Sequence, residues 1–144
     1  MKNAMKCLFL CATLLSTSGY ALTQQEAAEL LPVKITAVDA PKKNGMYSTI
    51  MKLHYQIDNN GEKDIDAIKA DLVILDIDGS EFQVMGSRSV SIPSGKSATT
   101  TFNHGYDESR FEDKKLQKLG TKMGAKLKVY EIIYADGSAE NVTQ

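Results

Sequence analysis

The sequence has few of the residues that build disulfides, metal sites or reactive centres. It contains no tryptophan, two cysteines and two histidines among 144 residues. Both cysteines, Cys7 and Cys11, fall within the first eleven residues. The rest of the chain therefore cannot form a disulfide framework, and its stability must come from a hydrophobic core.

The chain also lacks an excess of positive charge. Its formal net charge is −1, with 17 basic and 18 acidic residues. Lys2 and Lys6 are the charged residues of the first 21, so residues 22–144 keep 15 of the 17 basic residues and carry a net charge of −3. Nucleic-acid binding needs a concentrated basic surface, so we expect no nucleic-acid partner.

No apolar run is long enough to cross a bilayer, which takes about 20 residues. The N-terminal segment instead has the three zones of a cleavable export signal. Lys2 and Lys6 supply the basic start, residues 7–15 are apolar, and Gly19 and Ala21 are the small residues before a cleavage site. The sequence predicts a Sec-type signal peptide over 1–21, no transmembrane segment in the mature chain, and a periplasmic or secreted protein. A buried helix of a cytosolic domain is the weaker alternative.

About 120 residues follow the predicted signal, enough for one hydrophobic core. Residues 22–32 predict a short helical arm, because Thr23 and Glu26 have the spacing of a capping box and Pro32 ends the apolar pattern. From Val33 the apolar period changes to two, so we expect one β domain over 33–144.

The clearest strand pattern covers 46–58, where alternate residues are apolar or aromatic. A second strand over 67–77 is apolar at every position from Leu72 to Leu75, which predicts a central strand buried on both faces. Other strands are expected at 33–40, 82–92 with a bulge at Gly86, 98–102, 127–134 and 139–142. The buried face of the strand over 46–58 should carry Tyr47, Thr49, Met51, Leu53, Tyr55 and Ile57.

One segment breaks the strand pattern. Ser109 and Glu112 have capping-box spacing, and Gly120 is placed as the end of a helix, so a short helix should cross between two strands. The predicted fold class is therefore all-β: an immunoglobulin-like antiparallel β-sandwich with a short N-terminal helix and one short crossover helix.

Over residues 35–102 the chain resembles the small exported bacterial immunoglobulin-like domains of the FxLYD type. It departs from the name-giving motif at Leu72 and Leu75, where that family has phenylalanine and tyrosine. The resemblance implies a β-sandwich with a binding or structural role and no catalytic residues. The features that carry it are Asn59-Asn60-Gly61, then Asp76 and Gly79, then Ile92-Pro93-Ser94-Gly95.

Two patterns suggest metals, and each has a simpler interpretation. Asp76, Asp78 and Glu81 share one turn, but the twelve-residue loop of a calcium site is missing and such residues suit a turn between strands. Met51 and His54 are candidate copper ligands, but their parity places them on opposite faces of one strand. We therefore predict no metal and no cofactor.

The densest polar cluster lies in the predicted loop before the crossover helix, where a sandwich commonly carries its binding residues. No nucleophile, base and orienting group can be assembled from it. The helix itself carries a basic stripe, complementary to a separate acidic region that includes Asp76 and Asp78. The candidate binding residues are His104, Tyr106, Asp107 and Glu108 in the loop, and Lys114, Lys115 and Lys118 on the helix.

Together these features predict a non-enzymatic exported module that binds another protein of the cell envelope or outside the cell, through strand edges or through the loop at 104–108. The alternative is a periplasmic small-ligand or metal carrier, if Tyr47, Tyr55 and Met85 line a gap in the sandwich. The oligomeric state is not indicated by the sequence.

Overall fold

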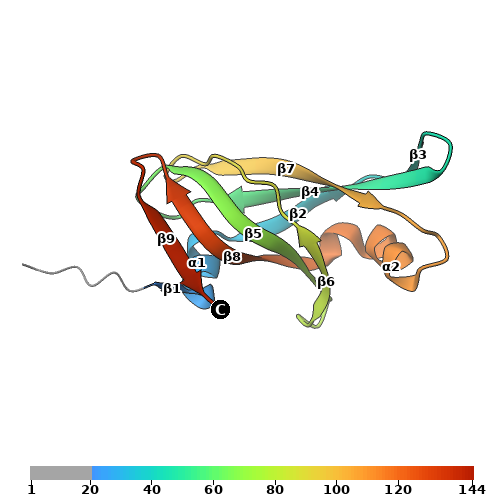
Figure 1. Ribbon diagram of the computed structural model, residues 1–144. Helices are drawn as coiled ribbons and strands as arrows, with labels where there is room; N and C mark the ends of the chain where they lie inside the picture. The colour runs from blue at the N-terminus through green and yellow to red at the C-terminus, as the bar shows by residue number, and fades with distance from the viewer. Residues whose placement is uncertain (1–20) are drawn as a thin grey trace, which may run out of the picture.

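The computed structural model describes residues 21–144, which form two β-sheets and two short helices (Figure 1). The predicted signal peptide lies outside the described residues except for Ala21. No helix within 21–144 is long and apolar enough to cross a membrane. The elements, in chain order, are β1 (Leu22–Thr23), α1 (Gln24–Leu30), β2 (Val33–Val38), β3 (Lys42–Asn44), β4 (Ser48–Asp58), β5 (Ile65–Leu75), β6 (Glu81–Gly86), β7 (Ser97–Gly105), α2 (Phe111–Leu119), the 3-10 turn η1 (Gly120–Lys122), β8 (Gly124–Tyr134) and β9 (Ala139–Thr143).

The two sheets enclose one hydrophobic core, so the prediction of an all-β fold is confirmed. One sheet has the strand order β1-β9-β8-β5-β6, and in the other β4 pairs with β2, β3 and β7. Every pairing is antiparallel except that of the two-residue β1, which runs parallel to β9. The prediction of an antiparallel fold is thus right apart from this one short strand.

Strand β4 has the predicted alternation over most of its length. Met51, Leu53, Tyr55 and Ile57 are fully buried on its inner face. Tyr47, however, is 94% exposed, so its predicted place on the buried face is wrong. The chain turns back before it, because Gly45 adopts φ 76° and lets β3 pair with the start of β4 in a hairpin.

Strand β5 lies between β8 and β6, which confirms the predicted central strand. Leu72, Val73 and Ile74 are all buried, as expected for a strand covered on both faces. The predicted bulge at Gly86 is wrong, because β6 ends at this residue. The chain then crosses to the other sheet, and Ile92 makes only an isolated bridge to Ile65.

Helix α1 docks the N-terminal arm on the domain. Its capping box is confirmed: Glu26 N donates to Thr23 Oγ1 at 3.2 Å, and Thr23 N donates to Glu26 Oε2 at 2.8 Å. Gln24 then pairs with β8 like a strand neighbour. Its Nε2 donates to the Val129 carbonyl at 2.6 Å, and Val129 N donates to its Oε1 at 3.1 Å.

Helix α2 is the predicted crossover, but it begins differently from the prediction. Its N-cap is Arg110, which makes no side-chain cap, so the predicted capping box of Ser109 and Glu112 is wrong. Ser109 instead donates from its N and Oγ to Asp107 Oδ1, at 2.8 and 2.7 Å. Gly120 ends the helix as predicted, with φ 48°.

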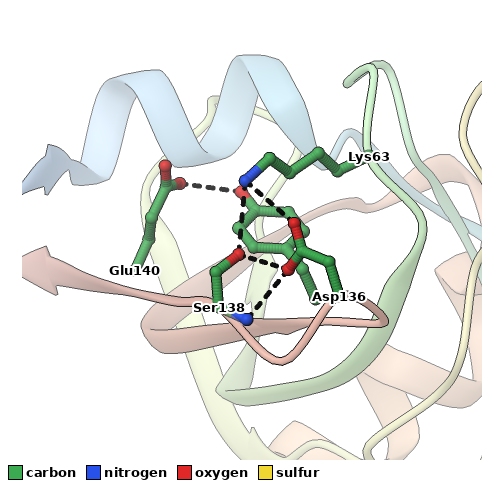
Figure 2. A network of polar contacts seen from close by, with 5 residues as sticks. Lys63, Asp136, Ser138 and Glu140 are labelled. Atoms are coloured by element: carbon green, nitrogen blue, oxygen red, sulfur yellow. Dashed lines mark hydrogen bonds and ion pairs between the residues drawn. The ribbon is translucent and has the colours of Figure 1, made fainter.

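A polar network joins the β8–β9 hairpin to the turn that precedes β5 (Figure 2). Lys63 Nζ lies 3.3 Å from Asp136 Oδ2, donates to Ser138 Oγ at 3.2 Å, and lies 5.0 Å from the centre of the Tyr134 ring. Tyr134 donates its hydroxyl to Glu140 Oε2 at 2.7 Å. Hydrogen bonds from Ser138, together with the Lys63 charge, lower the pKa of Asp136 to about 2.

The buried centre of β5 gives the first testable prediction. Leu72→Asp should lower the free energy of unfolding by more than about 4 kcal/mol, because an unpaired carboxylate would be forced into the core. The matched control is Val84→Asp on neighbouring β6, where the side chain is 56% exposed. Urea unfolding followed by circular dichroism measures both variants. Equal stability of the two would contradict the central-strand assignment.

The Asp136 network predicts a dependence of stability on acid. The folded pKa of about 2 is below the unfolded value of about 3.9, so ionised Asp136 favours the fold above about pH 4 and this contribution is lost as the pH falls through about 2. Asp136→Asn should therefore flatten the loss of stability between those pH values. Ser138→Ala removes the hydroxyl donor to Asp136 but keeps the backbone N–H donor, so it should flatten it less. Urea unfolding at a series of pH values tests this, and an unchanged slope in Asp136→Asn would refute it.

Candidate functional site

The β3–β4 hairpin and the loop that joins β7 to α2 lie at the same end of the sandwich (Figure 1). An open hollow lies between them. We call it the hairpin groove. Its volume is about 590 Å³. Three of the predicted binding residues lie in it, and sequence reasoning missed the residues that the hairpin contributes. The groove is lined by Pro41, Lys43, Tyr47, Thr49, Tyr106, Asp107 and Glu108.

His104 lies below this groove and not in a loop, because β7 continues to Gly105. The predicted loop position of His104 is therefore wrong. Its Nε2 lies 2.7 Å from Oδ1 of Asp113, a carboxylate that α2 buries completely. The other carboxylate oxygen, Oδ2, accepts a hydrogen bond from Asp107 N at 2.8 Å. Asp113 thus ties the strand, the loop and the helix together.

The loop above this pair is held at further points. Tyr106 N donates to the Thr49 carbonyl at 2.9 Å, and the Tyr106 hydroxyl donates to Gln117 Oε1 at 2.8 Å. The hydrogen bonds from Ser109 lower the pKa of Asp107, so this carboxylate stays ionised well into the acid range. The groove therefore presents an acidic edge whose backbone is fixed before any partner arrives.

Apolar side chains stand exposed at the same end of the molecule. Met46 and Tyr47, at the tip of the β3–β4 hairpin, are 84% and 94% exposed. The hairpin extends away from the sandwich in Figure 1. Phe111, the first residue of α2, is also exposed. The sequence signal for Tyr47 was misleading, because the alternation of apolar and polar residues starts before Ser48, where β4 begins.

The predicted lysines of α2 do not form one free stripe. Lys115 forms an ion pair with Asp76, and its Nζ lies 5.0 Å from the centre of the Phe82 ring. The predicted basic helix and part of the predicted acidic region are thus neighbours that neutralise each other. Lys114 and Lys118 are exposed on the helix and have no ion-pair partner among the described residues.

Comparisons with protein-family models, curated proteins and solved structures give no match. The function must therefore be argued from the geometry of this chain. Among residues 21–144, no group of three or more histidine, cysteine, aspartate or glutamate side chains is placed to hold a metal ion. The gap considered for a carrier does not form from the expected residues, because Tyr55 and Met85 are packed in the core whereas Tyr47 is on the hairpin tip.

A second polar network lies on the outer face of the β4 sheet, and nothing in the sequence pattern indicated it. His54 Nδ1 lies 2.8 Å from Thr101 Oγ1, and its Nε2 lies 3.2 Å from Asp39 Oδ1. Thr101, His54 and Asp39 thus have the same order as the hydroxyl, base and carboxylate of a catalytic triad. Thr101 is, however, the direct cross-strand neighbour of His54, so the contact follows from the β4–β7 register. We assign it to sheet stability.

The buried pair beneath the groove yields a prediction. Asp113→Ala should destabilise the fold by about 3 kcal/mol, because His104 and the Asp107 amide lose the partner that satisfies them. The matched control is Glu112→Ala, one residue earlier on the exposed side of α2, which should change stability by less than about 0.5 kcal/mol. Urea unfolding compares the two, and an Asp113→Ala protein as stable as the control would refute the anchoring role.

Proposed function

We propose that this chain is an exported, non-enzymatic module that binds another protein of the cell envelope or outside the cell through the hairpin groove. The exposure of Tyr47 is the observation that carries the proposal. A tyrosine left 94% exposed beside Met46, on a hairpin directed away from the core, does nothing for the fold of the monomer. Tyrosine and methionine are enriched in protein interfaces and depleted on free surfaces.

The chemistry of the groove favours a protein partner over a small ligand. The hollow is open, with aromatic residues Tyr47 and Tyr106 beside the carboxylates Asp107 and Glu108. Small-molecule sites are enclosed and mainly apolar, whereas an apolar patch with a charged rim is typical of a protein interface. A partner with an apolar residue flanked by basic ones would match it.

The immunoglobulin-like assignment is part of this proposal and rests on strand order. Among the seven strands of five or more residues, the first, second and fifth (β2, β4, β7) make one sheet, and the other four make the second in the order β9-β8-β5-β6. Such Greek-key connections are typical of immunoglobulin-like sandwiches. They are also compatible with the FxLYD-type resemblance. In these folds, loops at one end commonly carry the binding residues.

The export step of the proposal rests on the N-terminal sequence, with its basic start, apolar run and small residues before position 22. The absence of cysteine after Cys11 fits an oxidising destination, because no thiol there is available for unwanted pairing. A periplasmic or secreted location follows.

Photo-cross-linking in the organism that makes the protein tests this function. A benzophenone side chain at position 47 should give a discrete adduct with one partner, while the same group at Val84, exposed on the other sheet, should give none. Once the partner is identified, Tyr47→Ser and Tyr106→Ser together should weaken its binding at least tenfold. Ile77→Ser, at an exposed site on the β5–β6 turn, is the matched control. Equal adducts at 47 and 84 would reject the groove as the site.

A further inference from the structure

Strand β7 is the outermost strand of its sheet, and its outer backbone edge pairs with no strand within residues 21–144. It pairs with β4 alone (Figure 1), over an unbroken register from Ile50–Gly105 to Asp58–Ser97. In an antiparallel ladder, residues alternate between those that bond to the neighbour and those whose N–H and C=O point the other way. The parity of β7 therefore decides which groups are free.

Two bonds just beyond the strand fix this parity. Tyr106 N donates to the Thr49 carbonyl at 2.9 Å, and Asn59 N donates to the Lys96 carbonyl at 2.8 Å. Residues 96 and 106 thus bond toward β4, and so do the even-numbered residues between them. The odd-numbered residues turn their N–H and C=O outward. For Thr99, Thr101 and Asn103, these groups have no backbone partner among the described residues.

The other sheet edges of the molecule carry features that discourage pairing with another chain, and β7 carries none of them. Exposed edges are normally protected by charges, prolines, bulges or short length. Strand β6 has six residues and includes Glu81, and β2 has six residues, includes Lys34 and bears a register irregularity. Strand β7 has nine residues, Ser-Ala-Thr-Thr-Thr-Phe-Asn-His-Gly, with no carboxylate, lysine, arginine or proline and no irregularity.

The edge is complementary to itself. If two copies pair antiparallel about a two-fold axis at Thr101, all nine residues overlap and the odd-numbered residues oppose one another, as hydrogen bonding requires. Thr101 then opposes Thr101 of the second copy, and Thr99 opposes Asn103. Continued past the strand, the same register places Lys96 opposite Tyr106 and beside Asp107 of the second copy. The ammonium group of Lys96 in one copy would thus lie near the aromatic ring of Tyr106 and the carboxylate of Asp107 in the other.

We propose that the chain forms a two-fold dimer in which the β7 strands of two copies pair edge to edge and make one continuous sheet. The proposal goes beyond the binding function of the hairpin groove and does not depend on it. In the dimer, Thr99 of each copy exchanges two N–H···O=C bonds with Asn103 of the other copy, so the outward N–H and C=O groups of both residues are satisfied.

Edge-specific variants test the dimer by sedimentation velocity, using the full chain with Cys7→Ser and Cys11→Ser at up to about 100 μM, which reveals micromolar dissociation constants. The parent should be dimeric. Asn103→Pro and Thr99→Pro each remove an outward N–H that β4 does not use, so the fold should survive and the dimer should weaken at least tenfold. Asn103→Ala and Thr99→Ala keep the N–H and should dimerise. A monomeric parent, or proline variants that dimerise like their alanine controls, would overturn the proposal.

Single cysteines test the register even if a proline variant fails to fold. In the same background, Thr101→Cys should form a disulfide-linked dimer with oxidised glutathione, because opposed residues at this position lie about 5.5 Å apart between Cα atoms. Thr99→Cys alone should not, since two copies of residue 99 would be about 13 Å apart along the strands. Mixing Thr99→Cys with Asn103→Cys should restore the cross-link. Cross-linking of Thr99→Cys as fast as Thr101→Cys would reject the two-fold register.

Discussion

The structure depends on the burial of the inner face of β4 against the centre of β5. Met51, Leu53, Tyr55 and Ile57 meet Leu72 and Ile74 of the opposite sheet in a single cluster, and residues 21–144 contain no disulfide to supplement it. Each fully buried side chain of this kind contributes about 2 kcal/mol. This cluster also fixes which residues face outward. Once alternate residues of β4 are buried, the remaining residues of β4 must face away from the core, and the pairing register decides the same for its neighbour β7.

Where strands end, polar side chains make the hydrogen bonds to backbone groups that a neighbouring strand would otherwise make. Gln24 offers Val129 of β8 the amide pair that a neighbouring strand would offer. Asn59, almost fully buried, donates from Nδ2 to the Ile92 and Lys63 carbonyls, each at 2.9 Å. Asp113 plays the same part for the loop after β7. The contacts of Gln24 with Val129 and of Asn59 with Ile92 join segments distant in sequence, so the rim of the core is fixed there without covalent links.

These contacts also explain which features could be predicted from the sequence and which could not. Periodicity located the strands because burial acts residue by residue, and the Thr23 capping box was predictable because both partners lie within one turn. The Ser109 cap failed because Asp107, two residues earlier, competes for the same hydroxyl and amide. Asp113 was missed because an aspartate on a helix looks solvated until a histidine from another strand is placed beneath it. Tyr47 was misassigned because its turn depends on Gly45, and alternation alone does not mark where a strand begins.

Strand β7 connects the two proposed surfaces and limits how either can change. Its even-numbered residues face inward and bond to β4, ending in His104, which holds Asp113 and thereby the edge of the hairpin groove. Its odd-numbered residues present the free backbone edge. A substitution such as a charge at Phe102 would disturb packing and groove together, whereas Thr99 and Asn103 are exposed and make no described side-chain contact that the core needs. Charges could occupy those two positions at little expense to the fold. Because edges that stay free in solution are usually protected by such charges, the neutral composition of β7 argues that its edge is covered when the protein works.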